Sequence, residues 1–272
     1  MMTKQAVQKN SLNACLLNKR KEKRVGVIPF INGGDPDLKT TQSLLLACEK
    51  SNVCAVELGV PFPNSVTDGM AILKSHERAL LHQTQFEDII ELVYDFRRGS
   101  MLPIYLLAEF NHTVRQRSIE SVLTQAKSAG VDGFLMHCLP PVLLRSYLDI
   151  ARDVGIETIL GLFPNSKPKQ IQWVISETTG FIYLASTYRK TGSTSGFIPR
   201  TLAFFKQIRN LAKQPLAVGF GVKTRQDLET IFSSGVDAGI IGSSITAIIE
   251  YYLDDLTAMC AAVKHYLTEL QI

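Results

Sequence analysis

Residues 53–60 read Val-Cys-Ala-Val-Glu-Leu-Gly-Val, an apolar run that contains a single carboxylate, Glu57. The run is apolar at odd and even positions alike, whereas a strand with one face in water alternates apolar and polar side chains. This pattern predicts a strand that is covered on both faces, as in a parallel sheet flanked by helices. A longer polar loop, residues 61–70, follows it.

Similar apolar runs recur along the whole chain, and stretches with helical periodicity separate them. The predicted strands are residues 25–31, 53–60, 103–110, 133–138, 157–163, 181–186, 216–221 and 238–243. Helical periodicity is clearest in residues 38–50, 86–98, 119–129 and 225–234. Eight strands alternating with helices predict an α/β fold of the closed (β/α)8 type, the TIM barrel, for which about 250 residues are typical.

The length of 272 residues suits one such domain, with residues 1–24 as a basic, helical N-terminal extension. Leu12, Leu16 and Leu17 lie at helical spacing and predict an extra helix that plugs the N-terminal end of the barrel. Residues 1–24 hold seven basic residues and one acidic residue, a charge of +6, so the remainder of this +4 chain carries −2. Basic residues are therefore not spread over the fold, and no nucleic-acid partner is expected.

Composition also argues against several other classes of protein. No apolar run reaches the roughly 18 residues that span a bilayer, and the N-terminus lacks the pattern of an export signal. The cysteines are odd in number and scattered, without the spacing of a disulfide framework or a zinc site. We therefore expect a cytoplasmic protein with no metal site and no membrane contact. The five cysteines are Cys15, Cys48, Cys54, Cys138 and Cys260.

Glycines at the ends of the last two predicted strands indicate a phosphate site. Gly219-Phe-Gly221 ends the seventh strand, and Gly242-Ser243 ends the eighth, just before a predicted helix at 244–249. In TIM barrels the loops after these strands and the N-terminus of a short helix form the recurrent phosphate site. Gly192, in the long loop after the sixth strand, is a further candidate donor. The alternative is that these glycines serve only in tight turns. No G-x-G-x-x-G sequence follows the first strand, which disfavours a dinucleotide fold.

Two acidic residues are candidates for proton chemistry. Glu57 lies inside a buried strand, where desolvation raises the pKa of a carboxyl group and suits it to proton transfer near neutral pH. Its alternative is a structural salt bridge. Asp68 lies in the loop 61–70, where it is either a second site residue or merely a turn former. This loop and residues 187–198 are long for a barrel, and we expect both on the catalytic face.

The order of several motifs resembles the tryptophan synthase alpha chain family from about Val25 to the C-terminus. Glu57-Leu-Gly-Val-Pro-Phe62 matches the family's E-L-G-x-P-F, and Thr67-Asp-Gly69 falls at its A-D-G. Further matching segments are Pro29–Pro36, Gly130–Gly133, Leu139-Pro140, Gly180–Tyr183, Thr191-Gly192, Val218–Gly221 and Ile241–Ser243. The resemblance implies a lyase of tryptophan biosynthesis that cleaves indole-3-glycerol phosphate by a retro-aldol step to indole and glyceraldehyde 3-phosphate, without a cofactor.

The resemblance also implies a role for each matching residue. Glu57 corresponds to the general acid/base, and Asp68 to the carboxylate that pairs with the indole N–H. The implied substrate-binding residues are Phe30, Leu107, Tyr183 and Thr191. The implied phosphate-binding residues are Gly192, Gly221, Gly242 and Ser243.

Several positions depart from the family pattern and leave alternatives open. Asn64 replaces a carboxylate in a loop that contacts the beta chain in the family, Cys138 replaces an aspartate, Arg189 replaces a glycine, and Glu109 is brought close to the pocket. The chain is then either a diverged paralogue that supplies indole, or an alpha-like subunit of low intrinsic activity that binds and activates a beta chain. A different phosphate-bearing substrate is a third option. A His137–Cys138 dyad is disfavoured, because neighbours on a strand face opposite sides.

Overall fold

The computed structural model describes residues 12–185, 197–219 and 221–271. All its strands are parallel and belong to one sheet with the order β5-β4-β3-β2-β1-β9-β8-β7-β6. The strands are β1 (Gly26–Asn32), β2 (Val56–Gly59), β3 (Ile104–Glu109), β4 (Gly133–His137), β5 (Glu157–Thr158), β6 (Leu160–Leu162), β7 (Ile182–Ala185), β8 (Leu216–Gly219) and β9 (Ala238–Ile241).

The two end strands of this order, β5 and β6, are separated in the chain by Ile159 alone. β5 pairs with β4, and β6 pairs with β7, so the single predicted strand 157–163 joins both edges of the sheet. β5 and β6 together occupy one position between β4 and β7, so the nine strands of the described chain form a closed barrel with eight strand positions. The predicted TIM barrel is confirmed.

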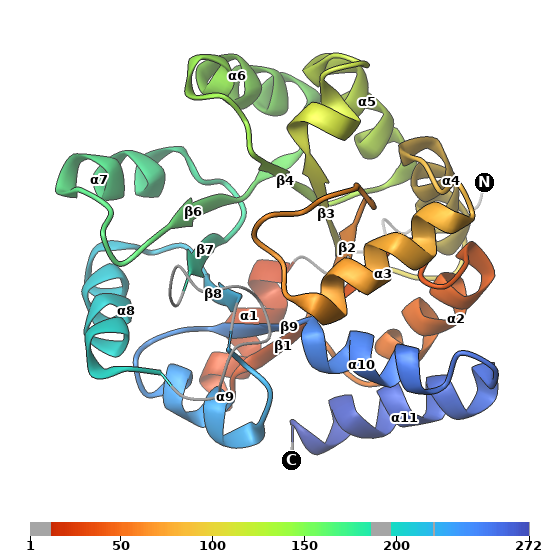
Figure 1. Ribbon diagram of the computed structural model, residues 1–272. Coiled ribbons are helices and arrows are strands. Elements are labelled where there is room, and N and C mark those ends of the chain that lie inside the picture. The colour runs from red at the N-terminus through yellow and green to blue at the C-terminus, as the bar shows by residue number, and fades with distance from the viewer. Residues whose placement is uncertain (1–11, 186–196, 220, 272) are drawn as a thin grey trace, which may run out of the picture.

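Helices surround the strands, and Figure 1 shows all of them except the first as an outer ring around the sheet. They are α1 (Leu12–Lys21), α2 (Leu38–Glu49), α3 (Met70–Leu81), α4 (Phe86–Phe96), α5 (Ile119–Ala129), α6 (Leu144–Val154), α7 (Pro168–Glu177), α8 (Pro199–Leu211), α9 (Arg225–Phe232), α10 (Ser243–Tyr251) and α11 (Leu256–Glu269). Gly130 and Gly155 end α5 and α6 with φ of 96° and 74°, the left-handed caps that glycine favours. A π-helix, η1 (Phe110–Val114), follows β3, and a 3-10 helix, η2 (Pro141–Leu143), precedes α6.

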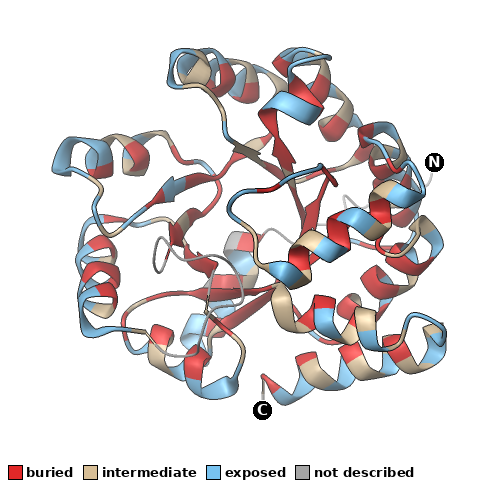
Figure 2. Ribbon diagram, in the orientation of Figure 1, coloured by how far each residue is buried: buried red, intermediate tan, exposed pale blue. Residues whose placement is uncertain are grey.

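The core has two parts. One lies between the strands and the outer helices, where the strands and the inward faces of the helices are buried (Figure 2). The other fills the barrel interior, and includes Ile28, Tyr105 and Phe181. Leu12 and Leu16 of α1 belong to this interior cluster, each 2% exposed, so the predicted N-terminal helix does close the barrel. Across the described residues, no helix is long and apolar enough to cross a membrane.

Candidate active site

Glu57 projects into the barrel from β2. It pairs in register with Phe30 of β1 and Tyr105 of β3; Tyr105 belongs to the interior cluster, and the partly buried Phe30 packs against it. Glu57 is 2% exposed, and its Oε1 atom has no hydrogen-bond partner among the described residues. Burial, together with the negative charge of Asp68, raises the pKa of Glu57 to about 8. The predicted buried acid is therefore no structural salt bridge, because no cation accompanies it in the described chain.

Asp68 ends the loop after β2 and lies just before Gly69, the N-cap residue of α3. Burial acts to raise its pKa, but hydrogen bonds from His76 and Ser65 and the nearby His76 and His137 outweigh it, so that the pKa is lowered. The two carboxyl groups are close enough for the charge of Asp68 to act on Glu57. Their pKa values move in opposite directions, so at neutral pH Glu57 is protonated and Asp68 is ionised. Acid pairs separated in this way are typical of sites for proton transfer.

Tyr183 of β7 completes this cluster on the opposite side of the barrel. Burial and the charges of Glu57 and Asp68 raise its pKa well above the ordinary value, so its hydroxyl stays protonated. The ring fills the space over Gly219 at the end of β8, where a Cβ would lie 1.7 Å from the tyrosine hydroxyl. Any side chain at residue 219 would therefore displace Tyr183. The structure brings together Glu57, Asp68 and Tyr183, as the sequence predicts.

Phe30 of β1 lies between β2, which carries Glu57, and β9, which leads to the predicted phosphate end. A Cβ at Gly59 would lie 3.0 Å from its Cζ atom, and a Cβ at Gly242 would lie 3.1 Å from its Cδ1 atom. Its ring therefore packs against glycines at the ends of β2 and β9. Leu107 is half-buried and stands opposite Gly59 in the parallel register, two residues beyond the interior Tyr105. Both side chains thus face the barrel interior near its C-terminal end.

The predicted phosphate site lies at the start of α10. Gly242 is the N-cap residue, and no side chain caps the helix there. The helix begins at Ser243, one residue before the predicted start. The first N–H groups of a helix have no intrahelical partner and attract anions. Gly221 has φ of 84°, a left-handed conformation that glycine adopts without strain. Thr191, Gly192 and Arg189 lie outside the described residues, so their predicted roles stay predictions.

Three imidazoles surround the Phe62 ring beside Asp68, and sequence reasoning missed this arrangement. The ring centroid of Phe62 lies 4.6 Å from His76, 5.9 Å from His112 and 6.4 Å from His137. Burial lowers the pKa of His137 although Asp68 and Glu109 act to raise it, so this imidazole is neutral near pH 7. No spacing in the sequence indicates that these histidines converge, since they come from α3, η1 and β4.

Glu109, predicted to lie near the pocket, is 4% exposed and caps the π-helix. It accepts hydrogen bonds from the His112 backbone N–H at 2.8 Å and from Asn111 Nδ2 at 2.9 Å, and lies 2.8 Å from His112 Nδ1. Burial acts to raise its pKa, but these hydrogen bonds outweigh it and lower the pKa. The carboxylate of Glu109 is thus well satisfied by its own turn, unlike that of Glu57.

The expectation that His137 and Cys138 face opposite sides is wrong. Cys138 Sγ lies 3.5 Å from His137 Nδ1. The strand ends at His137, and Cys138 has φ of 56°, so the alternation of a strand no longer governs its side chain. Burial and the charge of Glu109 nevertheless raise the pKa of the Cys138 thiol. A protonated thiol is a poor nucleophile, and the contact gives no support to thiol chemistry.

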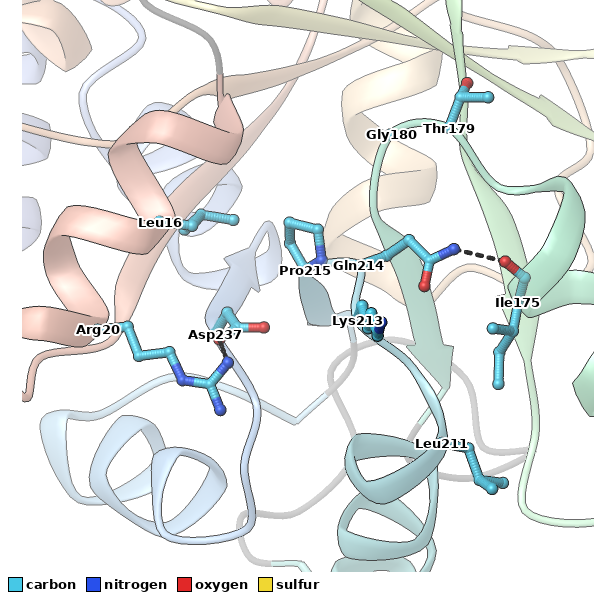
Figure 3. Close-up of a pocket in the computed structure, with 10 residues that line it drawn as sticks. All are labelled: Leu16, Arg20, Ile175, Thr179, Gly180, Leu211, Lys213, Gln214, Pro215 and Asp237. Carbon is cyan, nitrogen blue, oxygen red and sulfur yellow. Dashed lines mark hydrogen bonds and ion pairs between the residues drawn. The ribbon is translucent and has the colours of Figure 1, made fainter.

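A cavity of about 610 Å³ lies at the other end of the barrel (Figure 3). It is lined by Leu16 and Arg20 of α1 and by residues that precede β7, β8 and β9, among them Gly180, Pro215 and Asp237, which lies beside Arg20. None of the predicted site residues borders it. Within the described ranges, no cluster of histidine, cysteine, aspartate or glutamate residues could hold a metal ion.

Comparisons with known proteins agree with this geometry. The profile of the family described as "Tryptophan synthase alpha chain" matches residues 16–271. A tryptophan synthase alpha chain from Pyrococcus abyssi is 34% identical over 82% of this chain and 89% of its own length. One from Rippkaea orientalis is 32% identical over 96% of this chain and 99% of its own. A structure of the tryptophan synthase complex from Pyrococcus furiosus superimposes with a TM-score of 0.82, at 29% identity, over 91% of this chain and 98% of that chain.

The barrel and the family match together define a lyase of the TIM-barrel class. The family match extends over almost the entire chain. The chain belongs to the tryptophan synthase alpha chain family, the lyases that cleave indole-3-glycerol phosphate to indole and glyceraldehyde 3-phosphate.

Proposed function

We propose that Glu57 and Asp68 carry out the retro-aldol cleavage in this chain. The observation that carries the proposal is a buried Glu57 beside a partly buried Asp68, whose charge acts on Glu57 and whose pKa shifts in the opposite direction. At neutral pH one of them holds a proton ready for transfer, and the other holds a negative charge ready to stabilise a cation. The retro-aldol cleavage needs the transferable proton and the negative charge at the same time.

The protonated Glu57 donates its proton to C3 of the indole ring, which places a positive charge on the indole nitrogen. Asp68 accepts a hydrogen bond from the indole N–H and stabilises that charge. The bond between C3 and the glycerol carbon then breaks, and its electron pair restores the aromatic indole. The glycerol hydroxyl becomes the aldehyde and returns its proton to Glu57, so the enzyme leaves the cycle unchanged.

The substrate would extend from the acid pair towards α10, with Phe30 and Leu107 against the indole ring and Tyr183 beside the acids. Backbone N–H groups at Gly221, Gly242 and Ser243 would hold the phosphate, since the uncapped start of α10 favours an anion. Phe30 contacts Gly242, which supports a continuous path between the two ends. Thr191 and Gly192 would complete the site from the loop after β7.

A beta chain is the proposed partner, because relatives of this chain are named tryptophan synthase alpha chains and one is solved in a tryptophan synthase complex. Asn64, at the position where the family has a carboxylate, is exposed and has φ of 58°, which asparagine tolerates well. The loop therefore keeps its turn but loses a charge at the expected contact.

A reducing cytoplasm suits the five cysteines, which are all free thiols.

A steady-state assay of indole release by the isolated chain tests the proposal, with Glu57→Gln and Asp68→Asn as variants. We expect measurable cleavage by the wild type and almost none by either variant. Full activity in Glu57→Gln would show that the assigned chemistry is wrong. Beta-chain turnover with and without the protein separates the alternatives. Stimulation without solo cleavage would favour the regulatory subunit, and solo cleavage without stimulation would favour a stand-alone source of indole.

A further inference from the structure

His76 lies on α3, eight residues after Asp68, and is buried between Asp68 and Phe62. Its side chain is 4% exposed, and its Nε2 atom lies 3.4 Å from Asp68 Oδ2. The backbone N–H of Phe62 donates a hydrogen bond to the His76 Nδ1 atom at 3.3 Å. Since Nδ1 accepts this bond, the ring proton must be on Nε2, the atom that faces Asp68. With Nδ1 engaged in this way, the imidazole presents its Nε2–H group to Asp68.

The surrounding contacts hold this imidazole in place. Its ring packs against the Phe62 ring with centroids 4.6 Å apart. Ser75, the preceding residue on α3, accepts a hydrogen bond from Asn32 Nδ2 at 3.0 Å. Arg78, two residues further along α3, makes a two-pronged ion pair with the buried Asp35 at 2.6 and 2.9 Å. The helix is thus fixed to the end of β1 on both sides of His76.

We propose that His76 is a positioning residue for the lyase reaction, which holds Asp68 ionised and oriented through the chain Phe62 N–H, imidazole, carboxylate. The inference rests on the proposed role of Asp68. Sequence reasoning assigned no role to His76. A partly buried carboxylate needs hydrogen-bond donors to stay charged, and the Nε2–H group of His76 is such a donor. Asp68 then keeps its full negative charge for the indole cation.

Other groups also face Asp68, and they must be considered in any pH profile. Ser65 of the same loop donates a hydrogen bond, and His137 of β4 acts on it through its charge when protonated. Glu57 of β2 and Tyr183 of β7 face it across the site. On the other side of His76, the charge of Asp35 is already paired with Arg78. Loss of the His76 donor would raise the pKa of Asp68, and would leave Glu57 still next to an ionised Asp68 at pH 8.

The test is the pH profile of kcat/KM for indole release by the full chain and its variants. His76→Phe keeps the ring contact with Phe62 and removes the donor. We expect its acid limb to move to higher pH, with a loss of about tenfold at the acid end, the size of one hydrogen bond to a charged group. The alkaline limb, which Glu57 sets, should not move. His76→Gln places an amide N–H near the Nε2 position and should restore the acid limb.

His112→Phe is the matched control, since this imidazole packs on the same Phe62 ring but bonds to Glu109. Its acid limb should coincide with that of the wild type. Titration of the substrate phosphate is common to all variants and cancels in the comparison. A His76→Phe profile that is lowered equally at every pH, or one that is unchanged, would overturn the proposal. Failure of the proposed function is distinguishable, because Asp68→Asn would then stay active.

Discussion

At the N-terminal end of the barrel Asp132 and Asp237 are fully bonded, whereas at the C-terminal end Glu57 Oε1 has no partner in the described chain. Asp132 Oδ2 lies 2.7 Å from Arg97 Nη2 and accepts the Ile104 N–H at 2.9 Å. Glu57 belongs to β2, and Asp132 and Asp237 lie directly before β4 and β9. The ends differ in whether a cation and a backbone N–H accompany the carboxyl group.

Asp237, the second aspartate at the N-terminal end of the barrel, makes the same kinds of contact as Asp132. Asp237 Oδ2 lies 2.8 Å from Arg209 Nη1 and accepts the Leu216 N–H at 2.8 Å. Each arginine also packs over a glycine of positive φ, Arg97 over Gly130 and Arg209 over Gly235. Each aspartate follows a Gly-Val pair directly before a strand, in Gly130-Val-Asp132 and Gly235-Val-Asp237. The same arrangement of glycine, arginine and aspartate thus links two successive helix–strand connections at each of these two places.

Asp132 and Asp237 form ion pairs that stabilise the N-terminal end of the barrel. At the C-terminal end, Oε1 of Glu57 has no hydrogen-bond partner in the described chain. Removing one partner of a buried ion pair is costly, because the other charge stays buried and unpaired. Glu57 has no such partner, and it is kept neutral instead, with a pKa of about 8. Its retention in the interior therefore needs a functional explanation, and proton transfer supplies one.

The largest effect is expected for Glu57→Gln. The amide keeps the size of the side chain and removes the transferable proton, so kcat should fall by roughly a thousandfold, within the range for general acid–base catalysis. Thermal unfolding should occur at the wild-type temperature or above it at pH 8, because residue 57 then has no carboxyl group that could ionise in the interior. A variant that loses activity and also unfolds early would show that Glu57 supports the fold, and the contrast between the ends would fail.

The opposite result is expected for Arg97→Met at the other end. This change leaves Asp132 buried without its cation, and the free energy of unfolding should fall by about 3 kcal/mol. Its kcat, measured well below the unfolding temperature, should stay within about twofold of wild type. Arg209→Met should behave alike if the two units are equivalent. A lowered kcat without a change in denaturant midpoint would contradict the structural role.

A smaller effect is expected from pH. In the proposed mechanism protonated Glu57 is the active form, so kcat/KM should decline above about pH 8, approaching tenfold per pH unit. The pKa of Glu57 in the folded protein lies above its ordinary value of 4.5, so folding favours the protonated form. Its contribution to stability is complete below pH 4.5 and is lost as the pH rises through 8. The unfolding temperature should therefore fall over this range in the wild type.

The same titration in Glu57→Gln provides the control. This variant has no proton to lose at residue 57, so the part of the slope that comes from Glu57 should vanish. The slopes of other groups, among them Asp35 and Asp237, whose pKa values burial raises, should remain in both proteins. Identical slopes in the two proteins would show that residue 57 does not titrate in this range.

Much of the fold follows from the sequence, because its apolar runs are continuous and each belongs to a parallel strand. The burial of Glu57 follows from the same pattern, since one acid interrupts an apolar run. The division of residues 157–163 into β5 and β6 does not follow from it. Ile159 separates two short strands that pair with different neighbours, and this pairing depends on the closure of the whole barrel.

The surroundings of Asp68 could not be predicted for a similar reason. His76, His137 and Phe62 meet at Asp68 from α3, β4 and the loop after β2, and nothing local in the sequence relates them. The role of Glu109 as the cap of a π-helix could not be predicted from the sequence either, because η1 differs from an ordinary turn only in its hydrogen bonds. The burial of Glu57 was thus predictable from the sequence, whereas the role proposed for Asp68 came only from the family resemblance, and the donors around it could not be predicted.

The smallest effect is expected for Cys138→Ala, which tests whether the contact with His137 has any catalytic meaning. Both groups are uncharged near pH 7, because burial raises the pKa of the thiol and lowers that of the imidazole. An ion pair of thiolate and imidazolium would require both shifts to be reversed. We therefore expect kcat/KM of Cys138→Ala to lie within about twofold of the wild-type value. A thiol-alkylating reagent should inactivate the wild type no more than it inactivates Cys138→Ala. A loss comparable to that of Glu57→Gln would place Cys138 among the reacting groups and would end the assignment of the chemistry to the two acids.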